Sequence, residues 1–264
     1  MKGCYIEMGK KLLLLWFVLN FILIHGPNVD ALTRTREEYE KAGEAVWERN
    51  TTEKLVAITF DDGPHGVFTP KILDLLAKYD AKATFFVTGK NALLYPEIIK
   101  RQDAEGHEIG NHTFHHISSK HMNSSQLSME LDKTNEAIEK IIGKKPTLYR
   151  PVEGVYNDII IHTARKKGFE VIMWSWDQDA LDWLNPQSSK IVQHVKKGLS
   201  PGDIIILHDW NNSSISSTVK AMEPILELLT ENGYKCVTVS ELLYRTNRPL
   251  PPMLDPIPAL PLNQ

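Results

Sequence analysis

Short β-forming runs alternate with stretches of helical period along the middle of the chain, and this alternation restricts the fold more than any other feature. The strands that we expect lie near residues 55–60, 83–87, 108–111, 147–149, 170–174, 203–207 and 236–239. Stretches of helical period lie between them, as at 70–79 and 125–142. Such alternation is typical of a parallel sheet, which is either an open doubly wound sheet or a (β/α) barrel.

Polar residues suited to catalysis directly follow several of these strands, namely Asp61, Asp62, His112, Arg150 and His208. In a barrel, the carboxyl ends of all strands meet on one face, so these side chains would share one pocket. An open sheet would separate the outer ones. We therefore predict an α/β fold in the form of a distorted or incomplete (β/α) barrel of about seven parallel strands.

The N-terminal segment differs in composition from the rest of the chain. Lys2, Lys10 and Lys11 precede an apolar run over residues 12–24, which is shorter than the roughly 20 residues that a bilayer span needs. This pattern is typical of a signal peptide over residues 1–31 with cleavage after Ala31, and an uncleaved N-terminal anchor is the alternative. Under either interpretation, the domain that follows this segment is exported. We expect a secreted, extracellular or cell-wall-associated protein whose membrane contact is limited to such an anchor.

The remaining chain is long enough for one large domain and too short for two. We expect an entry helix within residues 32–53, one α/β domain over 54–248 and a proline-rich tail over 249–264. Cys236 is the one cysteine that would remain after signal cleavage, so we expect no disulfide. The formal net charge of −3 disfavours nucleic acid as a partner, and we expect a monomer.

Two histidines are spaced so that they could bind one metal ion. His112 and His116 are four residues apart, and a helical turn or a tight loop can direct both imidazoles at the same ion. Two histidines with one carboxylate are a common catalytic set for Zn²⁺ and similar ions, and Asp61 and Asp62 supply carboxylates. We do not expect His115 to bind. The alternatives are hydrogen-bonded structural histidines and an ordinary Asp-Gly-Pro turn.

The segment 174–183 combines three tryptophans with several aspartates, which is not the composition of a core. Indole rings stack well on sugar rings, and the acids could orient a histidine. His208 ends an apolar run and is therefore placed for proton transfer. We interpret the tryptophan segment as carbohydrate-binding, with a packed loop as the alternative.

Five short motifs resemble, in order, those of the NodB-homology polysaccharide deacetylases, carbohydrate esterase family four. They are Thr59 to Pro64, His112 to His116, Arg150-Pro151, Asp179 to Trp183, and Ile206 to His208. The resemblance extends from about residue 55 to residue 243. Five motifs in the same order are far more specific than any one of them.

The resemblance implies a role for each motif residue. One divalent ion, with Zn²⁺ preferred over Co²⁺ or Ni²⁺, is expected on Asp62, His112 and His116. Asp61, paired with Arg150, is implied as the base, and His208, oriented by Asp182, as the acid. Implied substrate contacts are Pro151, Glu153, Trp183 and Ile206. The chain departs from the family pattern at Val152 and Glu153, where the family usually has proline and an aromatic residue, and at Ile206, which replaces leucine.

The activity implied is metal-dependent removal of N-acetyl groups from an amino-sugar polysaccharide, with release of acetate. N-acetylglucosamine of peptidoglycan or of chitin-like oligomers is the expected substrate. The alternatives are an acetyl-xylan or other O-acetyl esterase, a two-metal phosphoesterase, and an inactive glycan-binding homologue. Every implied catalytic position is filled, which argues against the last of these.

Overall fold

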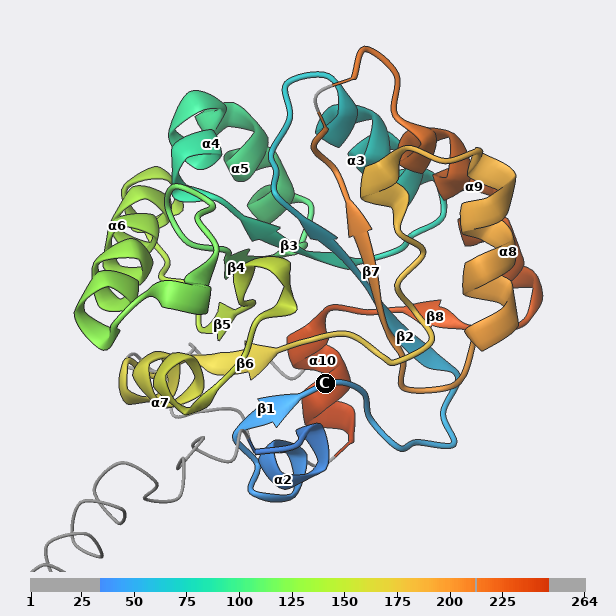
Figure 1. Cartoon of the computed structure of the whole chain (residues 1–264). Helices are drawn as coiled ribbons and strands as arrows, with labels where there is room; N and C mark the ends of the chain where they lie inside the picture. The colour runs from blue at the N-terminus through green and yellow to red at the C-terminus, as the bar shows by residue number, and fades with distance from the viewer. Residues whose placement is uncertain (1–33, 212, 247–264) are drawn as a thin grey trace, which may run out of the picture. The chain divides into compact units, whose positions relative to one another are not determined.

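The computed structural model describes residues 34–211 and 213–246, and the strands in this part of the chain form one parallel sheet (Figure 1). The strand order is β1-β6-β5-β4-β3-β2-β7, and β8 pairs with the start of β2. The strands are β1 (Ala45–Val46), β2 (Leu55–Asp61), β3 (Ala83–Val87), β4 (Glu108–Asn111), β5 (Leu148–Tyr149), β6 (Glu170–Ile172), β7 (Ile204–His208) and β8 (Lys235–Cys236). The sheet curls into a half-barrel whose two ends are β1 and β7, which confirms the predicted incomplete barrel.

The two faces of β2 differ in a way that prepares the site. Val56, Ile58 and Phe60 pack into the core on the outer face, under the helices. Successive side chains of a strand point to opposite sides, so the inner face carries Leu55, Ala57, Thr59 and Asp61. Along the inner face, the strand therefore changes from apolar at its start to polar at its carboxyl end.

Helices follow most strands and pack on the outer face of the sheet (Figure 1). They are α3 (Phe68–Lys78), α4 (Gly89–Leu94), α5 (Pro96–Ala104), α6 (Ser124–Ile142), α7 (Asp158–Lys166), α8 (Ser188–Gly198) and α9 (Ser217–Glu231). The short 3-10 turns are η1 (Ser119–His121), η2 (Val152–Gly154) and η3 (Asp182–Leu184).

The longest helix, α6, shows how the sequence sets its ends. Asn123 and Gln126 form a reciprocal capping box at its start, and Gly143 adopts a left-handed conformation at its end with φ 72°. Between these caps, Leu127 and Leu131 lie on one buried stripe, as the helical period predicts.

The last helix, α10 (Val239–Arg245), lies on the inner side of the half-barrel. Val239, Leu242 and Leu243 join a cluster with inner-face residues of six strands, among them Ala57 and Ile204. Leu55, Ala57 and Ile204 in this cluster lie near the start of their strands. At the carboxyl ends of β2 and β7 the inner face instead carries the polar residues Asp61 and His208.

Several element boundaries differ from the sequence prediction. The entry segment forms only a short helix, α2 (Arg36–Lys41), and then the strand β1, which pairs with β6. The strand expected at 236–239 ends at Cys236, because Val239 already begins α10 under a Thr238 cap. The strand expected at 170–174 ends at Ile172. The signal peptide or anchor expected over 1–31 and the tail expected over 249–264 lie outside the described residues.

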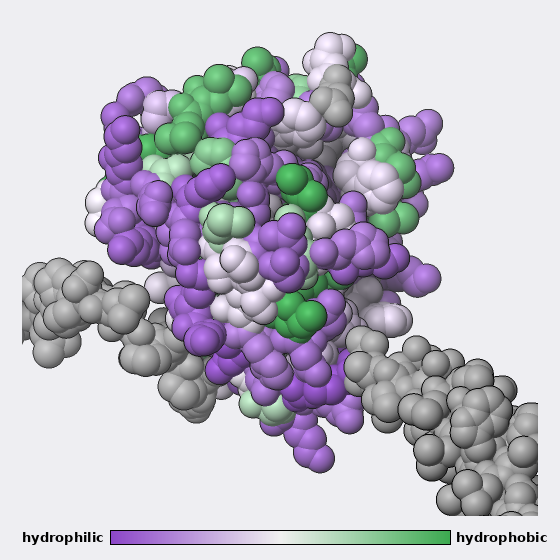
Figure 2. All heavy atoms as spheres, turned by 60° about the vertical axis from the view of Figure 1, so that its left-hand side comes forward, coloured by the Kyte–Doolittle hydropathy of each residue, from purple (hydrophilic) through white to green (hydrophobic). Residues whose placement is uncertain are grey.

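The surface view in Figure 2 shows a face that is largely hydrophilic, with apolar side chains in small separate groups. Within residues 34–211 and 213–246, the structure contains no helix with the length and apolar character needed to traverse a bilayer.

Gly202 and Gly168 both have positive φ, but only Gly202 lies against the entry segment. Substitution of the two by alanine therefore shows how tightly that segment is packed. Gly202 has φ 93°, and a Cβ atom there would overlap the Arg49 carbonyl oxygen, whereas Gly168 has φ 85° with open space around it. We expect Gly168→Ala to lower the free energy of unfolding by about 1–2 kcal/mol, the cost of left-handed backbone alone. Gly202→Ala should lower it by at least roughly 2 kcal/mol more, because overpacking adds to that cost. Urea unfolding measures both. Equal losses would show that the contact with Arg49 is loose.

Candidate active site

Strand register brings the predicted site residues to one level at the carboxyl end of the sheet. Asp61, the last residue of β2, lies opposite His208, the last residue of β7. On the other side, Asp61 pairs with β3, and Asn111 at the end of β4 pairs with Tyr149 at the end of β5. His112 and Arg150 each follow the last residue of their strand, so residues at the carboxyl ends of β2, β4, β5 and β7 meet here, with β3 between β2 and β4.

Asp61 and Arg150 form a buried ion pair. The guanidinium Nη1 lies 2.7 Å from Asp61 Oδ1, and Arg150 is fully buried. The same Nη1 donates to Thr59 Oγ1 at 2.7 Å. The pair thus joins the polar inner face of β2 to the end of β5, and it directs the free Asp61 oxygen, Oδ2, toward His112 Nε2 at 3.8 Å.

The other contacts of Arg150 hold its guanidinium rigidly. Nε donates to the Ile172 carbonyl and Nη2 to the Met173 carbonyl, at 3.2 and 2.8 Å. The guanidinium also lies over the Phe86 ring, 4.2 Å from the centroid, with the Trp174 ring at 5.8 Å. Burial lowers the pKa of Arg150 and the Asp61 charge opposes that shift, but an arginine remains charged in proteins. A fixed positive charge therefore stands behind Asp61.

Asp62, His112 and His116 bring one carboxylate and two imidazoles together. Asp62 Oδ1 lies 3.4 Å from His112 Nε2 and 2.8 Å from His116 Nε2, and the three donor atoms all lie within 4.8 Å of one another. Tetrahedral ligands bonded at about 2.1 Å stand about 3.4 Å apart, so this donor set fits a small divalent ion. Burial would raise the pKa of Asp62, but hydrogen bonds from His112 and His116 hold it well below its usual range.

His112 is fixed by the strands around it. Its backbone N–H donates to the Val87 carbonyl at 3.0 Å, and its ring Nδ1 lies 2.8 Å from the Arg150 carbonyl. Because Nδ1 is engaged there, Nε2 is the ring atom that faces Asp62. A metal-binding histidine typically has its second ring nitrogen hydrogen-bonded in this way.

The loop from His112 to His116 is a tight turn and not a helix. Thr113 and His116 have φ of 66° and 55°, in the left-handed region. Glu130 of α6 accepts hydrogen bonds from the backbone N–H groups of Phe114 and His115, at 3.0 and 2.8 Å. Glu130 Oε1 also lies 2.8 Å from His115 Nδ1. His115 is thus turned toward α6, outside the donor group, while His116 reaches Asp62.

His208 and Asp182 form a second pair at this level. Asp182 Oδ1 lies 2.7 Å from His208 Nδ1, and Asp182 Oδ2 accepts from the His208 backbone and from Thr218 Oγ1, at 2.8 and 2.6 Å. Burial disfavours the charged imidazole, but the bond to Asp182 and the charges of Asp61 and Asp62 outweigh it and raise the pKa of His208 to about 9. The raised pKa favours the protonated form of the ring, whose Nδ1 side is held by Asp182.

The four residues predicted to contact substrate occupy different depths. Pro151 is buried, whereas Glu153 is exposed and has φ 58° on the η2 turn. Trp183 is 53% exposed on η3, one residue after Asp182. Ile206 is buried on β7, two residues before His208 and therefore on the same side of the strand. Only Glu153 and Trp183 are placed at the surface of the site.

The tryptophan segment is divided between separate locations. The Trp174 ring lies near Arg150 and packs so closely on Gly154 that a Cβ atom there would overlap it. Trp176 is 79% exposed and lines a cleft of about 590 Å³ beside α2. The interpretation of the segment 174–183 as carbohydrate-binding stays a prediction, and of its three tryptophans Trp183 is the one next to Asp182.

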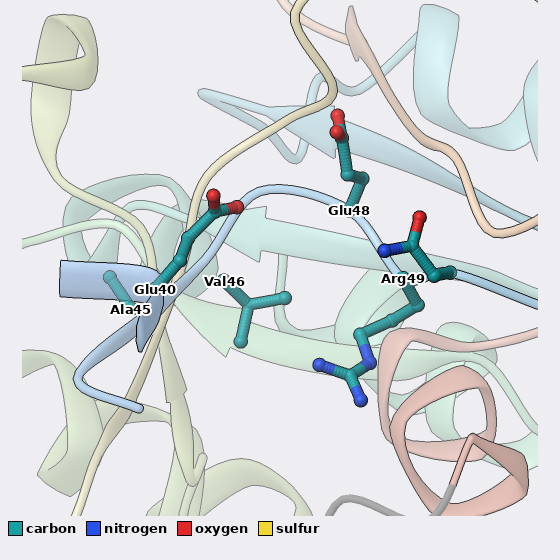
Figure 3. Close-up of a pocket in the computed structure, with 6 residues that line it drawn as sticks. Glu40, Ala45, Val46, Glu48 and Arg49 are labelled. Atoms are coloured by element: carbon teal, nitrogen blue, oxygen red, sulfur yellow. The ribbon is translucent and has the colours of Figure 1, made fainter. Parts of the chain in front are cut away.

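A cavity of about 220 Å³ adjoins that cleft and is lined by α2, β1 and residues 48–50. Figure 3 shows the carboxylates of Glu40 and Glu48 on one side of the chain and the Arg49 guanidinium on the other. Arg36 pairs with both carboxylates, at 3.2 and 3.0 Å, and Arg49 donates to Thr246 Oγ1 at 3.0 Å. These charges are used in holding the entry segment, and the cavity is separate from the site described above.

Glu130 and Thr59 support the site but were not among the predicted site residues, although Thr59 begins the first motif. Glu130 lies between Leu127 and Leu131 on the buried side of α6, and a glutamate in such a stripe was the available signal. Thr59 precedes Asp61 by two residues and so shares its face of β2, which the strand period could have indicated.

The chain resembles known proteins throughout this domain. The family model described as polysaccharide deacetylase matches residues 48–172. A peptidoglycan-N-acetylglucosamine deacetylase of Bacillus cereus is 44% identical over 79% of this chain and 97% of its own. A peptidoglycan-N-acetylmuramic acid deacetylase of Bacillus subtilis is 35% identical over 79% of this chain and 78% of its own.

A solved structure gives the same result at the level of fold. The crystal structure of a peptidoglycan N-acetylglucosamine deacetylase superposes with a TM-score of 0.75 at 32% identity, covering 79% of this chain and 97% of that one. The curled parallel sheet, the ordered motifs and these similarities agree, and the chain belongs to the polysaccharide deacetylase family.

Proposed function

We propose that this protein is a metal-dependent hydrolase that removes N-acetyl groups from amino-sugar units of a polysaccharide and releases acetate. One observation carries the proposal: a three-donor group for a divalent ion, a buried Asp61–Arg150 pair and a His208–Asp182 pair meet at the carboxyl ends of the strands. Amide hydrolysis needs a base for water and an acid for the leaving amine. The two pairs would supply these beside the donor group.

Asp62, His112 and His116 would hold the ion, with Zn²⁺ preferred and Co²⁺ or Ni²⁺ as alternatives, because imidazole suits these metals better than it suits Mg²⁺. When bound, such an ion supplies Lewis-acid polarisation of the acetyl carbonyl and a more acidic water. Three protein ligands leave coordination positions open for water and substrate. The site offers one such donor group among the described residues, which favours this reaction over two-metal phosphoester hydrolysis.

Asp61 would accept the proton of the attacking water. Its Oδ1 is engaged with Arg150 at 2.7 Å, and Oδ2 remains directed toward the donor group. The buried guanidinium favours the ionised carboxylate, which is the form that can accept a proton.

His208 would deliver a proton to the departing amine. Asp182 holds the Nδ1 side of the ring, so the Nε2 proton is the one available to the substrate. An amine is a poor leaving group unless it is protonated, whereas an alkoxide leaves more easily. A dedicated acid therefore favours N-acetyl over O-acetyl substrates.

N-acetylglucosamine of peptidoglycan or of chitin-like oligomers is the substrate that we infer. The B. cereus relative is named for that activity on peptidoglycan, and the B. subtilis relative for the muramic acid unit. Exposed Trp183 beside the catalytic pair suits stacking on a pyranose. We also propose export through residues 1–31, which would place the enzyme at the cell wall, and a mature N-terminus near Leu32 would support this.

Metal binding is tested by comparing the two histidines that sit side by side in the loop. We expect one divalent ion per wild-type chain, and loss of both the metal and acetate release in His116→Ala, which removes one of three ligands. His115→Ala is the matched control and should keep its metal, because His115 is turned toward Glu130. Metal analysis by mass spectrometry measures both. Full occupancy in His116→Ala would show that the ligand assignment is wrong.

The acid role of His208 predicts a specific pH dependence. Activity should fall as pH rises through the pKa of His208, which Asp182 raises. Asp182→Asn removes the charge that supports protonation, so the alkaline limb of kcat/KM should move to lower pH by roughly 1–3 units. Thr218→Val, which removes a neighbouring hydrogen bond to Asp182 and leaves its charge, is the control. An unmoved limb in Asp182→Asn would exclude His208 as the group that sets it.

The substrate is tested by acetate release from peptidoglycan, chitin oligomers, poly-N-acetylglucosamine and acetyl-xylan. We expect glucosamine units to be preferred over muramic units, because the Glu153 carboxylate repels the lactyl carboxylate. Glu153→Tyr should relax this discrimination, whereas Glu136→Tyr on the exposed side of α6 should leave it unchanged. Turnover confined to acetyl-xylan would contradict the proposal, as would faster release from muramic units. Sugar binding without acetate release would indicate an inactive homologue.

A further inference from the structure

The carboxyl group of Asp209, directly after His208, is buried beside the site and takes no part in the chemistry proposed above. Asp209 is 1% exposed. Burial raises the pKa of Asp209 to about 7; a hydrogen bond from Thr69 opposes this shift and the charge of Asp62 adds to it. A buried carboxyl group is unfavourable unless its surroundings satisfy it. Oδ2 of Asp209 accepts a hydrogen bond, whereas Oδ1 is buried without one among the described residues. The groups packed against this carboxyl group therefore indicate what it positions.

Asp209 is hydrogen-bonded to the loop that joins Asp62 to α3. Thr69 Oγ1, in the first turn of α3, donates to Asp209 Oδ2 at 2.6 Å and accepts from the His65 backbone N–H at 2.7 Å. The His65 ring in turn accepts from the Phe68 backbone at 3.1 Å. A chain of hydrogen bonds thus extends from Asp209 through the C-terminal part of this loop.

The N-terminal part of the loop is held by packing. A Cβ atom on Gly63 would overlap both carboxylate oxygens of Asp209, so the carboxyl group lies directly against the backbone of the residue after Asp62. From the other side, Thr88 N–H donates to the Gly63 carbonyl at 3.1 Å, and Asn91 Nδ2 donates to the Asp62 carbonyl at 2.8 Å. The backbone around Asp62 is therefore clamped between the end of β7 and the start of α4.

The backbone conformation of Asp62 has to be stabilised by the residues around it. Its φ of 76° lies in the left-handed region, which a non-glycine residue keeps only where its surroundings enforce it. The direction of the Asp62 carboxylate toward His112 and His116 depends on that backbone conformation. Loss of the contact on one side would allow the carboxylate to turn away from the imidazoles.

We propose that Asp209 is a positioning residue for the metal site: its buried carboxyl group fixes the Gly63–Thr69 loop and thereby fixes the Asp62 carboxylate against the two imidazoles. This inference rests on the proposed function only in taking Asp62, His112 and His116 as metal ligands. Asp209 itself does not contact the ion or the substrate in this account.

The test is the affinity of the purified full-length chain for Zn²⁺, measured by competition with a zinc-binding dye. Asp209→Ala should weaken binding by roughly 10–100-fold, the usual effect of removing a group that supports a metal ligand. Asp209→Asn keeps the shape of the neutral acid and an acceptor for Thr69, and it should bind Zn²⁺ much more tightly than Asp209→Ala.

Asp203 provides a matched control at the other end of the same strand. It is buried and accepts hydrogen bonds from Ser200 N–H at 2.7 Å and from Gln178 Nε2 at 3.2 Å. Asp203→Ala should lower the free energy of unfolding and leave Zn²⁺ affinity unchanged, because its loop is remote from Asp62. A loss of affinity in Asp203→Ala equal to that in Asp209→Ala would reduce the effect to general destabilisation and overturn the inference.

A second measurement tests the packing directly. Gly63→Ala alone should weaken Zn²⁺ binding, since its methyl group meets the Asp209 carboxyl. In the double variant Gly63→Ala/Asp209→Ala, removal of the Asp209 carboxyl group leaves space for the new methyl group. Gly63→Ala should therefore reduce Zn²⁺ affinity less in the Asp209→Ala background than in the wild-type chain. Additive losses would mean that the two residues do not act on each other. The double variant remains informative if Gly63→Ala fails to fold.

The outcomes separate this inference from the proposed function. A wild-type chain that binds Zn²⁺ with an Asp209→Ala variant of equal affinity overturns the inference and leaves the proposed function intact. A wild-type chain that binds no divalent ion overturns both. Zn²⁺ binding that depends on Asp209, in a chain without acetate release, upholds the inference and contradicts the proposed function.

Discussion

The buried ion pair between Arg150 and Asp61 is the interaction on which the rest of the site depends. The guanidinium is fully buried and donates to two side chains and two carbonyl groups, which come from β2, β6 and the residue after β6. The backbone carbonyl oxygen of Arg150 also lies in hydrogen-bond contact with the His112 ring. Removing either partner of such a pair strands a buried charge at a cost of about 3–5 kcal/mol. Fold stability and catalytic geometry are thus joined in one residue.

The inner face of the half-barrel explains how one fold can hold both an apolar core and a polar site. At the start of the strands, Ala57 and Ile204 meet apolar residues of α10. At the carboxyl ends of the same two strands stand Asp61 and His208, on the same face four residues later. Because side chains of a strand alternate with period two, this change from apolar to polar needs no change in backbone geometry. The loops after the strands then add Asp62, His112 and His116, the candidate metal donors.

The sequence alone predicted those parts of the structure that follow from strand periodicity and from the convergence of strand ends. Asp61, Arg150 and His208 could be grouped because each comes at the end of a strand, and Asp182 was implied by a family motif. The structure brings His208 and Asp182 to 2.7 Å. The role of each residue in the reaction stays a prediction.

The parts that were missed depend on contacts distant in sequence. β1 consists only of Ala45 and Val46, which pair with β6. Two residues are too few to show the alternation typical of a strand, so the sequence predicts a helix for this segment. Glu130 acts through backbone groups of a loop 15 or 16 residues away, and Asp209 through Gly63 and Thr69. The apolar stripe around Glu130 indicates that its side chain is buried, but the local sequence does not indicate the partners of either acid. Only the tertiary arrangement identifies them.

Asp61 and Asp62 are adjacent in the chain, but the proposed mechanism gives them different roles, Asp61 as the base and Asp62 as a metal ligand. The most direct measurement is metal content and acetate release in purified, folded Asp61→Asn. The account predicts that this variant keeps its divalent ion and loses turnover by roughly 100-fold or more, as expected for a missing general base. Loss of the metal from Asp61→Asn, or turnover close to that of the wild-type chain, would contradict it.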